Sequence, residues 1–108
     1  MPSYKLGDVV LMKFPFTNNL GFKKRPALVI KDTNDGDVIV CRITCTSSYS
    51  LYDIELKNWA QYGLKLPSII RVHKIAALEK NLLDLKFGEI DVLVKSQVVN
   101  IVQLLLQP

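Results

Sequence analysis

The chain has 108 residues, 49% of them hydrophobic, and a formal net charge of +4. A chain of this length is expected to form one domain, here residues 1–108, and to bury about two-thirds of its unfolded surface without disulfides. Its apolar runs are far shorter than the roughly 20 residues of a membrane-spanning helix, which excludes such a helix. Because no apolar leader follows the first basic residue, we expect a cytoplasmic protein.

Basic and acidic residues are unevenly distributed along the chain. Residues 1–31 hold six basic and one acidic side chain, residues 32–56 one basic and five acidic, and residues 57–74 four basic and none acidic. If the fold brings the two basic stretches together, they form a positive surface suited to phosphates. A solvated face without a ligand explains the same distribution, so charge alone leaves both interpretations open.

The two cysteines, Cys41 and Cys45, indicate neither a metal site nor a disulfide. His73 is the only histidine, so a zinc ion would lack ligands, and we expect no metal and no cofactor. Within one strand the two cysteines would lie roughly 13 Å apart, too far for a relaxed disulfide. We expect both to be small, half-buried apolar side chains in a reducing compartment.

Short β-branched and aromatic runs, interrupted by proline, glycine or polar residues, predict strands along most of the chain. The expected strands are residues 8–14, 27–30, 38–44, 52–56, 68–75 and 82–90. Between them we expect loops over residues 16–24 and 44–50 and a helical turn over 58–62. The Asp-Gly turn within Asn34–Asp37 predicts that the second and third strands form a hairpin.

The end of the chain has the pattern of a helix. Asp91 is the expected N-cap, and the helix is expected to run to about Gln107. Apolar residues recur at helical spacing at Val94, Val98, Ile101, Val102 and Leu105. Five or six short strands with one terminal helix predict a small, mainly β protein with a strongly bent sheet or barrel.

Three motifs occur in the order and at the spacings of a known family: Gly7-Asp8-Val9-Val10, Lys23-Lys24-Arg25-Pro26-Ala27-Leu28-Val29-Ile30, and Ile43-Thr44. With Tyr62-Gly63-Leu64, Pro67-Ser68-Ile69-Ile70 and Leu78-Glu79 further on, nearly the whole chain resembles the MazF/PemK (Kid) toxins. The resemblance implies an SH3-like barrel of the CcdB/MazF type with a C-terminal α-helix, assembled as a homodimer.

The resemblance also implies a function. Such a protein is the toxin of a type II toxin-antitoxin system and has a cognate antitoxin as its partner. It cleaves single-stranded RNA, in particular mRNA, at short sequence motifs and without a metal. The 2′-hydroxyl attacks the phosphate, which leaves 2′,3′-cyclic phosphate and 5′-hydroxyl ends. We expect the antitoxin to be acidic and partly disordered, so that it can occupy the same basic surface as RNA.

The family's catalytic arginine and threonine correspond to Arg25 and Thr44. Arg71 fits a further arginine of the PemK/Kid branch, but His73 stands where that branch has an aspartate. Arg25 suits electrostatic stabilisation of the transition state, because a guanidinium stays charged and matches phosphate oxygens. Histidine gives and takes protons near neutral pH, which makes His73 the residue to test. Structural roles remain open: His73 as a packed strand residue, Thr44 as a strand-end cap.

Other residues are expected to bind the RNA strand. Lys23 and Lys24 would meet backbone phosphates, although they also explain a soluble loop. Unpaired bases stack on aromatic rings, and Phe22 is the best candidate because its loop is polar, whereas Trp59 is expected in the core or an interface. The remaining expected RNA-binding residues are Phe16, Thr17, Thr46, Ser47 and Ser68. Arg42 shares the parity of Thr44 on its expected strand, but nothing else in the sequence separates it from a surface charge.

Two other functions are compatible with the same fold. A CcdB-like toxin poisons gyrase by binding, but the tryptophan-containing tail of those toxins is missing here, where the chain finishes Leu106-Gln107-Pro108. A catalytically inactive SH3-like binding module is the other, because His73 replaces the acid. The apolar residues Leu104–Leu106 are explained by a second copy, by an antitoxin segment or by burial on the barrel.

Overall fold

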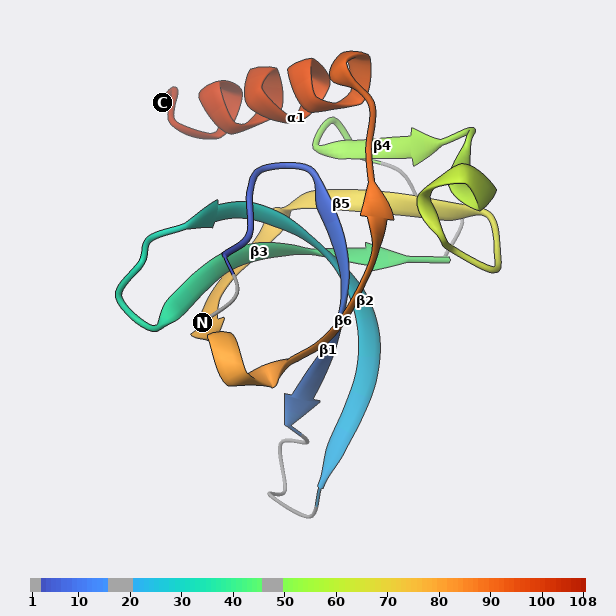
Figure 1. Ribbon diagram of the computed structural model, residues 1–108. Helices are drawn as coiled ribbons and strands as arrows, with labels where there is room; N and C mark the ends of the chain where they lie inside the picture. The colour runs from blue at the N-terminus through green and yellow to red at the C-terminus, as the bar shows by residue number, and fades with distance from the viewer. Residues whose placement is uncertain (1–2, 16–20, 46–49) are drawn as a thin grey trace.

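The computed structural model describes residues 3–15, 21–45 and 50–108 (Figure 1). Six strands form one antiparallel sheet in the order β4-β5-β3-β2-β1-β6. The elements are β1 (Asp8–Pro15), β2 (Phe22–Asp32), β3 (Asp37–Thr44), β4 (Asp53–Leu56), η1 (Trp59–Tyr62), β5 (Ser68–Glu79), η2 (Lys80–Leu82), β6 (Leu83–Glu89) and α1 (Val92–Leu105). The mainly β fold with a C-terminal helix is confirmed. Among the described residues the bent sheet is not closed, since β4 and β6 form two edges.

Two predicted boundaries are wrong. The loop expected over residues 16–24 ends earlier, because β2 begins at Phe22 and pairs with β1 as far as Pro15. The strand expected over 68–75 continues to Glu79 along β3. In both cases the added residues have little strand propensity of their own, as the lysines of β2 illustrate. Pairing with a neighbouring strand makes them part of the sheet.

The sheet buries apolar residues on both of its faces. One cluster includes Val9, Leu28, Ile43 and Ile70, with Val98 of α1. The other cluster contains Val10, Met12, Ala27, Val29, Val38 and Val40. Since successive side chains of a strand point to opposite faces, the continuous apolar runs of the central strands supply both clusters. In Figure 1, α1 lies across the end of the molecule formed by β4 and β5, over the first cluster.

Asp91 caps α1, as predicted. Its Oδ1 accepts a hydrogen bond from the backbone N–H of Val94 at 3.0 Å, and its Oδ2 accepts one from the Tyr62 hydroxyl at 2.8 Å. The bond from Val94 and then that from Tyr62 hold the pKa of Asp91 below its ordinary value. The cap therefore also fixes η1 to the start of the helix. The helix ends at Leu105, two residues before the expected Gln107.

Gly63 allows η1 to approach β6 closely. It ends η1 with φ +86°, in the left-handed region that favours glycine. A Cβ atom at this position would lie 2.7 Å from Cβ of Phe87 and 3.0 Å from its carbonyl oxygen. No larger residue fits without displacing β6, so Gly63 sets where the segment 63–66 lies.

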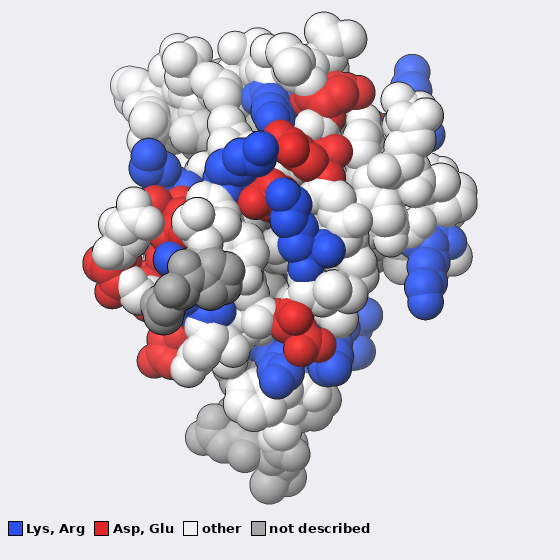
Figure 2. Space-filling model, viewed as in Figure 1, with Lys and Arg blue, Asp and Glu red and all other residues white. Residues whose placement is uncertain are grey.

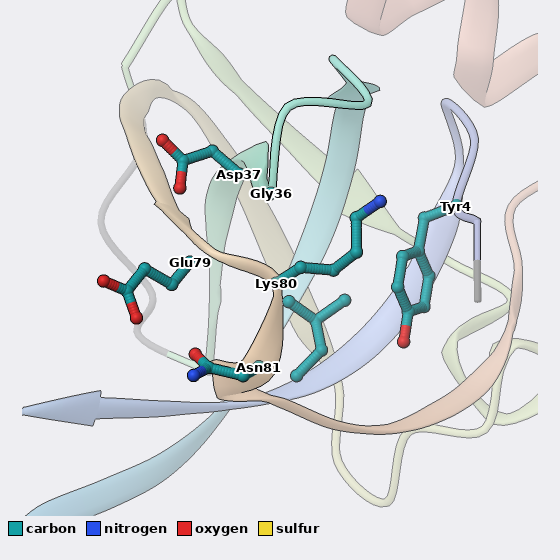
Figure 3. A pocket seen from close by; sticks show the side chains of 7 residues that line it. Tyr4, Gly36, Asp37, Glu79, Lys80 and Asn81 are labelled. Carbon is teal, nitrogen blue, oxygen red and sulfur yellow. The ribbon is translucent and has the colours of Figure 1, made fainter. Parts of the chain in front are cut away.

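A buried ion pair connects η2 to the end of β2. The Lys80 Nζ lies 2.9 Å from Oδ1 of Asp32, and the two side chains are only 7% and 3% exposed. Figure 3 shows Lys80 extending toward Tyr4, whose backbone N–H donates to Oδ2 of Asp32 at 2.9 Å. The hydrogen bond from Lys80, followed by those from Tyr4 and Asn34, lowers the pKa of Asp32 to about 2.

We expect Gly63→Ala to lower the free energy of unfolding by about 2–4 kcal/mol, because backbone strain and the contact with Phe87 add together. Gly36→Ala is the matched control: its φ is +94°, but nothing lies within 4 Å of the added Cβ. It should lose only the roughly 1–2 kcal/mol of the left-handed backbone. Urea unfolding of both variants measures the difference, and equal losses would show that Phe87 contributes nothing.

The ion pair of Asp32 should make stability depend on acid pH. Because the folded-state pKa lies below the ordinary value of 3.8, the stabilisation is complete above that value and is lost as the pH falls toward 2. The gap in melting temperature between the natural chain and Asp32→Asn should therefore shrink over this range. Melting curves recorded from neutral pH down to about pH 2 test this, and a constant gap would contradict it.

Candidate nucleic-acid interface

A groove with a cavity volume of about 970 Å³ lies at the start of β2 and the end of β3, away from the turn that joins these two strands. Four strands, the segment 63–66 and the start of β5 contribute to it. We call it the basic groove, and its lining residues are Leu11, Phe14, Lys23, Arg25, Pro26, Arg42, Ile43, Thr44, Cys45, Gly63, Leu64, Lys65, Leu66, Ser68, Leu85 and Phe87.

The basic groove brings Arg25 and Thr44 together. In the antiparallel pairing of β2 with β3, Ala27 lies directly opposite Arg42. Arg25 is two residues before Ala27 and Thr44 two residues after Arg42, so both continue on the same face of the sheet. The two residues predicted as the catalytic pair therefore line one groove, from different strands.

The lining of the basic groove is electrostatically one-sided. Of the described residues that line it, Lys23, Arg25, Arg42 and Lys65 are basic and none is acidic. Lys23 and Arg25 come from the first basic stretch of the sequence and Lys65 from the second, so the fold does unite the two. Such a cleft with low-dielectric walls attracts polyanions.

Several basic residues outside the groove lining are paired with acidic residues. Lys86 lies 3.0 Å from Asp8, Lys5 lies 3.3 Å from Glu89, and Lys95 also contacts Glu89. Figure 2 shows the result on the face seen in Figure 1, where basic and acidic atoms alternate down the middle of the molecule. The groove lining, in which no described residue is acidic, therefore differs from that face.

The structure separates the two adjacent lysines. Lys23 lines the basic groove, whereas Lys24 lies on the opposite face of β2 and pairs with Asp84 at 3.0 Å. The alternation of a strand explains the difference, since the pair lies in β2 and not in a loop. Hydrogen bonding and charge from Lys24 lower the pKa of Asp84.

Other predicted RNA-binding residues differ in position. Ser68 lines the groove and donates a hydrogen bond to the carbonyl of Leu66 at 2.8 Å, which leaves its oxygen able to accept. Phe22 is 57% exposed at the start of β2 but is not among the lining residues. Trp59 packs against the core, as expected. The predicted residues that lie outside the described part of the chain are Phe16, Thr17, Thr46 and Ser47.

Sequence reasoning missed several lining residues. Arg42 was indistinguishable from a surface charge, although it has the strand parity of Thr44, and this parity was the available signal. Phe14 and Phe87 line the groove as apolar walls, and Lys65 enters from the segment after Gly63. Their positions depend on which strands meet, which periodicity within one segment does not show.

Arg71 and His73 are not among the lining residues. Arg71 lies directly opposite Arg42 in the pairing of β3 with β5, so it adjoins the basic groove on the same face of the sheet. Both side chains approach Asp53 of β4: Nε of Arg71 lies 3.3 Å and Nδ1 of His73 3.8 Å from its Oδ1. The side chain of Asp53 is fully buried.

The cysteines occupy different environments. Cys41 is buried in the core, where burial raises the pKa of its thiol to about 12. Cys45 is exposed and lines the basic groove, so the expectation that both are half-buried is wrong. Both thiols are free. Within the described ranges, no three His, Cys, Asp or Glu residues lie close enough to hold a metal ion together.

A second hollow, of about 530 Å³, lies at the opposite end of β3 (Figure 3). Asp37 and Glu79 contribute acidic side chains to it, and its one basic residue, Lys80, is already paired with Asp32. This hollow does not suit a polyanion, which leaves the basic groove as the candidate site.

An open antiparallel sheet with one terminal helix, and a groove whose described charged residues are all basic, define a small β protein with a surface suited to an anionic ligand. A family model described as the PemK-like, MazF-like toxin of type II toxin-antitoxin systems matches residues 5–106. The chain therefore belongs to the PemK/MazF toxin family.

Solved structures share the fold. A MazE-MazF complex from Deinococcus radiodurans is 19% identical with a TM-score of 0.75, over 98% of this chain and 97% of that one. An endoribonuclease in complex with its cognate antitoxin, from a mycobacterial species, is 19% identical with a TM-score of 0.73, over 98% of both chains. The Mycobacterium tuberculosis toxin MazF-mt6 is 17% identical with a TM-score of 0.65, over 84% of this chain and 88% of that one.

At these identities the likeness establishes the fold alone. A search of curated proteins finds no match. Over the described residues, α1 included, no helix combines the length and apolar character needed to span a membrane.

The two lysines offer a matched test of the groove. Lys23→Ala should weaken binding of a single-stranded oligoribonucleotide about 3- to 10-fold and reduce the slope of log Kd against log salt by about 0.7, because one phosphate contact is lost. Lys24→Ala removes the same charge from the opposite face and should change neither quantity by more than about twofold. Fluorescence anisotropy at several salt concentrations measures both, and equal effects would count against the groove.

Proposed function

We propose that this chain is a toxin endoribonuclease of a type II toxin-antitoxin system, which cleaves single-stranded RNA, chiefly mRNA, in the basic groove. The observation that carries the proposal is that Arg25 and Thr44 line one groove whose described charged residues are all basic. Membership of the PemK/MazF family supports the same function. The reaction needs no metal in this proposal, because the RNA supplies its own nucleophile.

The 2′-hydroxyl attacks the adjacent phosphorus. A bond forms between the 2′-oxygen and phosphorus, and the bond from phosphorus to the 5′-oxygen breaks. The 2′-oxygen loses a proton and the departing 5′-oxygen gains one, which leaves a 2′,3′-cyclic phosphate and a 5′-hydroxyl. Negative charge accumulates on the non-bridging oxygens in the transition state, so a donor that remains cationic stabilises that state most.

Arg25 supplies that donor. A guanidinium presents planar N–H groups that fit two phosphate oxygens and stays charged throughout the reaction. The hydroxyl of Thr44 is suited to donate one more hydrogen bond to a non-bridging oxygen. Neither group is a good proton acceptor near neutral pH, so the proton transfer falls to another group, for which His73 is the candidate.

The remaining groove residues divide into two kinds. Lys23, Arg42 and Lys65 are positioned to contact the phosphates on either side of the cleaved linkage, which gives affinity without sequence preference. Phe14 and Phe87 provide apolar walls against which unpaired bases can stack, and selectivity for a short motif would come from such contacts. The hydroxyl of Ser68 is suited to a base edge or a phosphate oxygen.

The partner we propose is an antitoxin whose acidic segment occupies the basic groove in place of RNA, with the toxin acting as a homodimer in the cytoplasm. Two similar solved structures contain MazE or a cognate antitoxin with the toxin, which supports an antitoxin as the partner. Exposed apolar residues of α1, among them Val92, Leu93 and Val99, are available for contact with a second copy.

Arg25→Ala should lower the rate of RNA cleavage about 100- to 1000-fold, and Thr44→Val about 10-fold, because each removes transition-state stabilisation. Lys57→Ala, an exposed charge outside the groove lining, is the control and should leave the rate unchanged. The assay uses purified protein with single-stranded RNA in a chelator, and maps the product ends.

The outcomes separate the three functions. Products with cyclic phosphate ends, lost in Arg25→Ala, support the endoribonuclease. Intact RNA with inhibition of gyrase would support the CcdB-like toxin. Intact RNA without gyrase inhibition would support an inactive binding module.

A further inference from the structure

Three charged or titratable side chains meet beside the basic groove at the carboxylate of Asp53. Its Oδ1 lies 3.3 Å from Nε of Arg71 and 3.8 Å from Nδ1 of His73. The Asp53 side chain is 0% exposed, and those of Arg71 and His73 are 24% and 23% exposed. A carboxylate removed from water in this way is stabilised by the groups that face it, and the side-chain nitrogens of Arg71 and His73 both face Oδ1.

The other side of this carboxylate is fixed by backbone. Its Oδ2 accepts a hydrogen bond from the N–H of Ser50 at 2.7 Å, and the N–H of Asp53 donates to the carbonyl of Ser50 at 3.3 Å. The ring of Tyr52 packs on that of His73, with centroids 5.4 Å apart. Asp53 is therefore held in place independently of Arg71 and His73, so it can orient them.

The atoms that face each other are otherwise unsatisfied. Oδ1 of Asp53, Nε of Arg71 and Nδ1 of His73 are buried and have no hydrogen-bond partner within the described part of the chain. Buried polar atoms without partners are costly, so an approach of Nε and Nδ1 to Oδ1 would stabilise all three atoms. The separation of 3.8 Å at His73 is longer than a hydrogen bond, and a closure of about 1 Å would make it one.

Strand pairing connects this cluster to the basic groove. Arg42 of β3 lies directly opposite Arg71 of β5, which lies directly opposite Asp53 of β4, so the three form one row across the sheet. Arg42 lines the groove. Two arginines side by side repel each other, and Asp53 offsets the charge of the one that is further from the groove.

We propose that Asp53 is a positioning residue for RNA cleavage, which holds the Arg71 guanidinium beside the basic groove and fixes the orientation and tautomer of His73. The inference rests on the proposed function. A carboxylate next to Nδ1 keeps the proton of the neutral ring on that nitrogen. Nε2, on the other side of the ring, is then the atom left to accept the 2′-hydroxyl proton, and Asp53 stabilises the imidazolium that results.

In this proposal β4 contributes a carboxylate that orients two side chains of β5, a role that the sequence did not indicate. Arg71 and His73 share a face of β5 but lie two residues apart, and neither can fix the other. The carboxylate that faces both comes from the neighbouring strand. Asp53 itself need not touch the RNA, because it acts through the two side chains that it orients.

The first test uses no substitution and no RNA. Because His73 is the only histidine, the imidazole ¹⁵N spectrum of the full chain contains one residue. At a pH where the ring is neutral, we expect the spectrum of a ring protonated at Nδ1 and bare at Nε2. In Asp53→Asn we expect that preference to be lost. A wild-type ring protonated at Nε2, or one whose tautomer does not change in the variant, would overturn the proposal.

The second test is kinetic. Asp53→Asn should lower kcat for RNA cleavage about 10- to 100-fold with KM within about twofold, because substrate binding is kept while the reacting groups lose their alignment. Glu55→Gln is the control: it removes an exposed acid two residues along the same strand and should leave kcat unchanged. An unchanged kcat in Asp53→Asn would overturn the proposal.

The two tests also separate failure of the inference from failure of the proposed function. If the wild-type chain does not cleave RNA, the proposed function fails, while the tautomer of His73 still decides whether Asp53 orients the ring. If Asp53→Asn does not fold, the wild-type spectrum alone decides. If RNA is cleaved and the ring is protonated at Nε2, the function stands and the role of Asp53 is refuted.

Discussion

The antiparallel pairing of β2 with β3 is the constraint on which the candidate site depends. It fixes Ala27 opposite Arg42, and so carries Arg25 and Thr44 along the same face into one groove. A slip of one residue would turn either side chain to the opposite face. The register is held by the apolar residues of the same strands, which are buried on both faces, so the packing of the core and the geometry of the site have a common cause.

Much of the fold could be predicted because its signals are local. The Asp-Gly turn, the apolar runs of the central strands and the cap at Asp91 each lie within a few residues of the element that they define. The pairing of Arg25 with Thr44 was expected from a resemblance in ordered motifs, not from periodicity. The limits of β2 and β5 were missed, because strand ends depend on the partner strand as well as on the residues themselves.

The parts of the site that could not be predicted come from contacts between distant segments. Asp53 belongs to a strand that the sequence predicts, but its role does not follow from that strand, because only the pairing of β4 with β5 places it against Arg71. The sequence did not distinguish Lys24 from Lys23, but the two side chains lie on opposite faces of β2. Lys65 and Phe87 meet in one groove because Gly63 lets the segment after η1 approach β6. No single segment of sequence contains that information.

The distribution of ion pairs makes the basic groove the candidate site for an anion. Asp8 of β1 and the two β6 acids Asp84 and Glu89 form ion pairs with lysines outside the groove lining. Asp53 pairs with Arg71. Arg25 and Arg42 have no such ion-pair partner among the described residues, so a ligand of opposite charge is the partner that suits them. In the proposed function the phosphates of RNA supply that charge. An acidic antitoxin segment would supply the same charge to the same residues, so the proposal that one groove serves both partners requires only one set of basic side chains.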